Sequence, residues 1–178
     1  MNKNLSFKKS PIQSGYGAAM LKSAVEYVWN DFLMHSYEIK DQQTMDWSVS
    51  TLNEYNFVQK TISHPDLIEY RKNLQIADDS KVNESLWQSG ITQLIPVLSD
   101  LLQKGIDVEK LDENPAKGIA TFFVQDEFLE EAQDEDYLFS TFGNASSQWH
   151  LGVGYDWSAM IVNKRSMKLT IIDLTGAR

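Results

Sequence analysis

The densest group of side chains able to do chemistry lies at residues 126–136. Seven of these eleven positions carry a carboxylate, and none carries Lys or Arg. The seven are Asp126, Glu127, Glu130, Glu131, Asp134, Glu135 and Asp136. Because like charges repel one another, we expect this acidic segment to stay solvated, with Phe128 and Leu129 fixing one side of it to the core.

The acidic segment (residues 126–136) allows three interpretations. It favours a docking surface for a basic protein, because concentrated negative charge attracts a cationic surface and can cover it. It is also typical of a solvated linker between a helical part and a sheet. A cation site is the third, although the EF-hand spacing with its central Gly is absent from the sequence.

The three histidines, His35, His64 and His150, are scattered along the chain. The sequence has no HExxH motif and no two His at i, i+4 spacing, so it predicts no metal site. We expect His35 to end a helix, where it interacts with the helix dipole. His64 precedes Pro65 and is expected in a turn.

A second group of side chains that could take part in chemistry lies nearer the C-terminus: Gln148, Trp149, His150, Asp156, Trp157 and Asp173. The group resembles the His-bearing sheet of papain-like and ubiquitin-like proteases, which need a Cys nucleophile. The chain has no Cys and no Gly-x-Ser-x-Gly motif, so this resemblance implies at most an inactive scaffold. An enzyme or degenerate hydrolase-like domain with a site around His150 and Asp156 is the alternative function.

The aromatic residues Trp149, Tyr155 and Trp157 have two interpretations. They form either part of the core or an exposed patch that contacts a partner. We therefore place them with the seven carboxylates as candidate partner-binding residues. Gly152 and Gly154 lack the rest of a dinucleotide-binding motif, so no cofactor is expected.

Composition narrows the class of protein. The chain has 178 residues, a formal net charge of −9 and no cysteine. Its negative charge disfavours direct binding of nucleic acid, whose phosphates would repel it. No stretch approaches the roughly 20 apolar residues of a membrane span, and no apolar signal region follows the polar start. We therefore expect a cytoplasmic protein without a membrane partner.

Periodicity predicts helices in the first part of the chain. Apolar residues recur at helical spacing over residues 17–36, and again, more weakly, over 65–75. Residues 52–62 fit a helix or a strand. A further helix is expected over 83–104, capped by Asn83 and kinked or divided at Pro96.

The pattern changes after Pro115, where short apolar runs alternate with turns. Strands are expected over residues 119–124, 137–142, 148–155, 158–162 and 168–174. The polar residues 163–166 predict a hairpin turn between the last two. Without long helical spacers, these strands should pair antiparallel.

These elements predict one α+β domain over residues 1–178. Its N-terminal helices would pack on a C-terminal antiparallel sheet of about four to five strands. Residues 1–13 would form a loose N-terminal arm, 14–112 would be mainly helical and 115–178 mainly strand.

In its acidity, small size, aromatic surplus and lack of catalytic motifs, the chain resembles immunity proteins of bacterial polymorphic-toxin systems, including contact-dependent growth inhibition. The resemblance is one of general character and fixes no residue. It implies a non-catalytic protein that neutralises a cognate basic toxin, such as a nuclease, by occluding its active site. An inhibitor of host defence that mimics nucleic acid is a third possibility, and it predicts carboxylates spaced over the whole surface.

Overall fold

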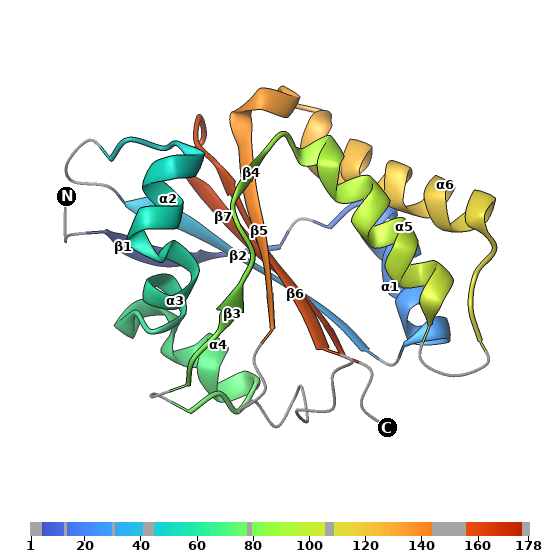
Figure 1. Ribbon diagram of the computed structural model, residues 1–178, viewed down its shortest axis with the longest axis horizontal. Coiled ribbons are helices and arrows are strands. Elements are labelled where there is room, and N and C mark those ends of the chain that lie inside the picture. Colours follow the sequence, from blue (N-terminus) through green and yellow to red (C-terminus); the bar gives the residue numbers. More distant parts are fainter. Residues whose placement is uncertain are drawn as a thin grey trace.

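The computed structural model consists of one antiparallel sheet between two groups of helices (Figure 1). Helices α2, α3 and α4 cover one face of the sheet, and α1, α5 and α6 cover the other. The structure describes residues 5–12, 14–29, 31–40, 45–77, 80–105, 109–143 and 156–175. The predicted α+β class is confirmed, but the predicted layout is wrong in several elements.

The sheet contains strands from both ends of the chain. Its order is β1 (Ser6–Ser10), β2 (Asp31–Lys40), β7 (Lys168–Thr175), β6 (Asp156–Asn163), β5 (Tyr137–Gly143) and β3 (Asn83–Glu84), and β4 (Gln88–Ser89) also pairs with β5. All of these pairs are antiparallel. Within the described residues the sheet therefore has seven strands rather than four to five, and it is not confined to the C-terminal part.

The hairpin of β6 and β7 confirms the turn predicted at residues 163–166. The side chain of Asn163 closes this turn by accepting hydrogen bonds from the backbone N–H groups of Arg165, at 3.0 Å, and Ser166, at 2.9 Å. Both faces of β6 are apolar: Ala159 and Ile161 point to one helical layer, and Met160 and Val162 to the other. A strand covered on both faces needs no polar side, so its sequence does not alternate.

The first helical layer contains α1 (Tyr16–Val28), α5 (Leu94–Lys104) and α6 (Glu113–Val124). Each buries one stripe, as Leu21 and Val25 of α1 do, and Leu94 and Leu98 of α5. The second layer contains α2 (Val49–Tyr55), α3 (Phe57–Ile62), the short 3-10 helix η1 (Pro65–Leu67) and α4 (Ile68–Asn73). Among the described residues, no helix combines the length and the apolar character needed to cross a membrane.

The predicted helix over residues 17–36 is wrong in its second half. Helix α1 ends at Val28, and Asp31–Lys40 forms strand β2 between β1 and β7. Phe32 packs into the core of the α1 layer, whereas Tyr37 and Ile39 pack into the core of the α4 layer. This two-sided burial overrides the helical spacing of the apolar residues. His35 consequently lies on a strand and not at a helix end.

The strand predicted over residues 119–124 is also wrong, because these residues form the end of α6. The buried side chains of α6 are Ala116, Ala120, Phe123 and Val124, which follow helical spacing. Likewise, residues 83–104 are not one helix: β3 and β4 come first, and α5 begins only at Leu94. Pro96 therefore lies in the first turn of α5, where its missing N–H has no helical partner to lose.

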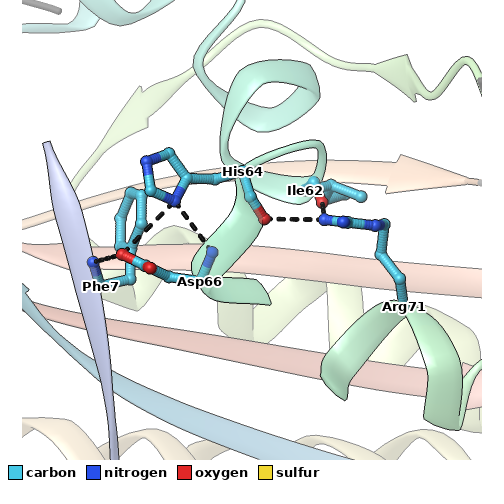
Figure 2. Close-up of polar contacts among 5 residues, drawn as sticks. All are labelled: Phe7, Ile62, His64, Asp66 and Arg71. Atoms are coloured by element: carbon cyan, nitrogen blue, oxygen red, sulfur yellow. Dashed lines mark hydrogen bonds and ion pairs between the residues drawn. The ribbon is translucent and has the colours of Figure 1, made fainter. Parts of the chain in front are cut away.

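The N-terminal segment is not a loose arm, because Ser6–Ser10 forms the edge strand β1. Figure 2 shows how it is held to η1. Asp66 accepts a hydrogen bond from the backbone N–H of Phe7 at 2.8 Å, and His64 Nδ1 accepts one from the N–H of Asp66 at 3.2 Å. Arg71 donates to the carbonyls of Ile62, at 2.6 Å, and His64, at 2.7 Å. The prediction of His64 as a turn residue is confirmed.

Candidate functional site

The acidic segment forms one wall of a hollow of about 380 Å³ on the α1 side of the sheet. The opposite wall consists of sheet side chains. Its lining includes Asp126, Glu127, Glu130 and Glu131 from the segment, and Met34, Ser36, Tyr137, Ile161, Asn163, Lys168 and Thr170 from the strands. The site therefore combines a carboxylate wall with an opposite wall of mixed polar and apolar side chains from the sheet.

Local structure explains why the segment lies here. Helix α6 continues into a π-helical turn, η3 (Gln125–Leu129), and a 3-10 turn, η4 (Asp134–Asp136), precedes β5. Phe128 is buried and packs edge-to-face against Phe123 and Tyr137, with ring centroids 5.6 and 5.5 Å away. The hydroxyl of Tyr137 also donates to the carbonyl of Phe128 at 2.7 Å. Phe128 thus fixes the segment to the core, as predicted.

Two carboxylates of the segment hold the start of α1. Glu127 Oε1 accepts a hydrogen bond from the backbone N–H of Gly15 at 2.7 Å, and Asp126 Oδ2 accepts one from Gly17 at 2.8 Å. The first N–H groups of a helix lack partners within the helix, and the positive end of its dipole favours anions. A Cβ at Gly17 would lie 2.9 Å from Cβ of Asp126 and 3.0 Å from Cα of Phe123. The close approach of this helix start to α6 therefore requires glycine.

Two further carboxylates are also bound to backbone N–H groups. Asp134 Oδ1 accepts from Thr92 at 2.8 Å, at the 3-10 turn η2 (Ile91–Gln93) that precedes α5. Asp136 Oδ2 accepts from Gln133 at 3.0 Å and lies 3.9 Å from Nη1 of Arg165. The segment therefore connects η2, α6 and β5.

The expectation that the carboxylates of the acidic segment stay solvated is only partly correct. Glu130, Glu131 and Glu135 are exposed, whereas the four carboxylates bound to backbone amides are half-buried: Asp126, Glu127, Asp134 and Asp136. Their amide partners are neutral, so the hydrogen bonds orient these carboxylates without cancelling their charge. Burial raises the pKa of Glu127, and hydrogen bonds from the backbone N–H groups of Gly15 and Ala18 oppose that rise. Among the lining residues that the structure describes, Lys168 supplies the one positive charge.

The candidate aromatic and histidine residues are only partly placed. Trp149, His150 and Tyr155 lie outside the described residues, as does the strand expected at 148–155. Trp157 is half-buried and packs against the core of the α1 layer. Asp156 begins β6 opposite Thr175. The structure therefore does not join Trp157 to the carboxylate wall of the hollow.

A buried polar cluster lies on the opposite face of the sheet beneath α4. Asp173 and His35 were singled out in the sequence, but it was not predicted that they meet there with Tyr70 and Ser158. Asp173 is fully buried, and its Oδ1 accepts hydrogen bonds from Ser158 Oγ at 2.6 Å and from the hydroxyl of Tyr70 at 3.0 Å. His35 Nε2 lies 3.7 Å from Asp173 Oδ2, and neither atom has a hydrogen-bond partner among the described residues. A signal was present, since Asp173 is the single charged residue between Lys168 and the end of an apolar strand.

Burial controls the charge of this cluster. It raises the pKa of Asp173 to about 7, against the opposing effect of the hydrogen bonds from Ser158 and Tyr70. Burial also lowers the pKa of His35 to about 4, with a smaller contribution from the positive charge of Lys9. Between these two values the carboxyl of Asp173 holds a proton and His35 is neutral. The 3.7 Å contact is therefore not an ion pair in that pH range.

The cluster contains Ser, His and Asp but lacks the geometry of a hydrolytic triad. Ser158 donates to Asp173, whereas a nucleophilic serine must give its proton to a histidine. Ser158 is also fully buried, so a substrate could not reach it. We therefore assign the cluster a structural role. Within the part of the chain that the structure describes, no group of three or more His, Asp or Glu side chains could hold a metal ion.

Comparison with protein-family models gave no match, and neither did comparison with curated proteins.

Proposed function

We propose that this chain is a non-catalytic binding protein that holds a basic protein partner at the hollow beside the acidic segment. One observation carries the proposal: four carboxylates line a hollow in which Lys168 is the one cation among the described lining residues. Two of them, Asp126 and Glu127, are held in place by backbone N–H groups. The other two, Glu130 and Glu131, are exposed at the surface.

This arrangement suits an arginine or lysine side chain of a partner. Charge-assisted hydrogen bonds to carboxylates are about twice as strong as neutral ones, and arginine can make two in parallel. Because Asp126 and Glu127 are already oriented, less side-chain entropy is lost on binding. The exposed Glu130 and Glu131 would act earlier, by attracting a cationic surface and raising its association rate.

We further propose that the partner is a toxin, such as a nuclease, and that binding covers its active site. A nuclease must attract phosphates and therefore presents a cationic site. An acidic wall that fits this site would both recognise and block it. The acidity of the whole chain, with a net charge of −9, supports this choice of partner class. We propose the cytoplasm as its site of action.

The toxin proposal predicts protection of growing cells. The product of the gene immediately upstream should be toxic when expressed in the cytoplasm, and co-expression of this chain should restore growth. The double variant Glu130→Gln, Glu131→Gln should weaken protection, because it removes the exposed part of the carboxylate wall. The matched control is Glu54→Gln with Glu109→Gln, which removes the same charge from exposed positions that do not line the hollow.

The result expected is growth with the wild-type chain and with the control, and reduced growth with the variant of the acidic segment. An upstream gene product without toxicity, or toxicity that the chain fails to relieve, would contradict the toxin proposal. Equal loss of protection by both variants would show that net charge, rather than this site, is responsible.

A further inference from the structure

Helix α1 exposes an apolar stripe along one side. Tyr16, Met20 and Tyr27 are 84%, 47% and 57% exposed. Their spacing of four and seven residues places them on the same side of a helix, away from the buried Leu21 and Val25. Three large exposed side chains in one row are an unusual surface for a helix that already packs on a sheet.

The stripe lies beside α6. Gly17 of α1 contacts α6 so closely that a Cβ there would lie 3.0 Å from Cα of Phe123 and 2.9 Å from Cβ of Asp126. Met20 follows Gly17 by one helical turn, so it lies toward the same side of α1. On α6, Phe122 is 37% exposed and adjoins Phe123, the residue whose backbone comes closest to Gly17 of α1. Phe122 thus extends the apolar surface across the two helices.

The acidic segment borders one end of this apolar surface. Gly15 and Gly17, at the start of α1, are bonded to Glu127 and Asp126, and Tyr16 lies between them. The apolar row therefore begins where the carboxylate wall of the hollow begins. An apolar centre with aromatic side chains and a charged border is the usual composition of a protein interface.

We propose that Tyr16, Met20, Tyr27 and Phe122 form the apolar part of the docking surface for the basic partner, continuous with the acidic hollow. This inference rests on the proposed function and adds the residues that give it affinity. Charge at a rim mainly speeds association, whereas buried aromatic and apolar anchors slow dissociation. The partner must then present aliphatic or aromatic side chains next to its arginine or lysine residues, as a basic amphipathic helix does.

Charge argues against a second copy of this chain as the occupant. In a two-fold symmetric dimer the same patch meets itself, so the carboxylates bordering α1 would be brought close to one another. Like charges held together across an interface disfavour association. The cation nearest the stripe in sequence, Lys22, already lies 3.7 Å from Glu26 of its own helix. A basic partner meets no such penalty.

The test uses two fluorescent synthetic peptides of equal length and charge. One carries Arg and Leu at helical spacing, and the other carries Arg and Ser. Met20→Gln with Tyr27→Gln should weaken binding of the Arg/Leu peptide about ten-fold or more, because it removes the apolar anchors. It should leave binding of the Arg/Ser peptide unchanged. The matched control is Ile68→Gln with Leu86→Gln, which removes two exposed apolar side chains elsewhere, 45% and 75% exposed.

The same measurement separates the two proposals. In one outcome, the Glu130→Gln, Glu131→Gln variant weakens binding of both peptides while the Met20→Gln, Tyr27→Gln variant weakens binding of neither. That result would support the acidic site and overturn the apolar surface. If neither double variant changes binding, or if the wild-type chain binds neither peptide, both proposals are overturned. Self-association of the chain alone that disappears with Met20→Gln and Tyr27→Gln would assign the surface to a second copy, against our inference.

Discussion

Asp173 and His35 illustrate how burial determines the protonation state of single residues. Between pH 4 and 6.5 the folded chain holds one proton on this pair, on the carboxyl of Asp173. The unfolded chain also holds one, on His35, because Asp173 then has its ordinary pKa of 3.8 and His35 its ordinary 6.5. Since both states bind equal numbers of protons, the pair adds almost no pH dependence to stability in this range. Tyr70 and Ser158 donate hydrogen bonds to Asp173, Tyr37 interacts with its charge, and Lys9 acts on His35.

Substituting either residue alone should therefore make the free energy of unfolding depend on pH, with opposite signs for the two substitutions. In Asp173→Asn the unfolded state binds one proton more than the folded state, because the pKa of His35 is depressed on folding. The free energy of unfolding should then rise relative to wild type by about 1.4 kcal/mol per pH unit from pH 4 to 6.5. In His35→Phe the raised pKa of Asp173 acts alone, and stability should fall by a similar slope as pH rises.

Urea unfolding of the three proteins between pH 4.5 and 6.5 measures these slopes. Parallel pH dependence in all three would contradict the assigned protonation states. The offset between the proteins carries no information about protonation, because Asp173→Asn and His35→Phe also change hydrogen bonds and packing in the core.

At the scale of elements, the contact between α1 and α6 depends on the absence of a side chain at Gly17. Gly17→Ala would force its Cβ against the backbone of Phe123, and backbone cannot move aside as the end of a flexible side chain can. We expect a loss of roughly 1–3 kcal/mol in the free energy of unfolding, as for other overpacked positions.

Gly118→Ala is the matched control for this prediction, because it lies in the same pair of helices with nothing within 4 Å of its added Cβ. Alanine favours a helix interior over glycine, so this change should raise stability by roughly 0.5–1 kcal/mol. Thermal unfolding should show a lower midpoint for Gly17→Ala and a higher one for Gly118→Ala. Shifts of the same sign would contradict the close contact at Gly17.

The predictable elements were those specified by neighbouring residues. The hairpin of β6 and β7, strand β5 and the turn at His64 follow from local turn residues and apolar runs. Strand β2 was mistaken for helix because its apolar side chains divide between two cores, which removes the alternation of a one-sided strand. The end of α6 was mistaken for strand because Phe122, Phe123 and Val124 favour strands, although their partners Ala116 and Ala120 follow helical spacing.

The functional site shows the same division. Composition located the acidic segment and Phe128 as its anchor. It could not show that Asp126 and Glu127 bind Gly17 and Gly15, because these contacts join residues 109 and 112 positions apart. The bond between Tyr70 and Asp173 spans 103 positions. Such contacts depend on the order of strands and helices in space, and the local pattern of a single sequence does not reveal that order.

At the scale of the molecule, the acidic hollow and the exposed apolar stripe of α1 lie on the same side of the sheet. The sheet separates a helical layer with the buried Asp173 cluster from a layer that carries the acidic hollow and the exposed stripe of α1. The central claim is that the exposed carboxylates on the α1 side of the sheet attract a cationic partner. Such attraction must weaken with salt, because the screening length falls from about 10 Å at 0.1 M to about 3 Å at 1 M.

The most direct measurement is the association rate of an arginine-rich peptide with the chain, recorded by stopped flow from low to high salt. At low salt, Glu130→Gln with Glu131→Gln should slow association several-fold, whereas Glu54→Gln with Glu109→Gln should leave it close to wild type. The three rates should converge at high salt. Equal rates for wild type and the Glu130/Glu131 variant at low salt, or equal slowing by both double variants, would contradict the claim that this hollow attracts the partner.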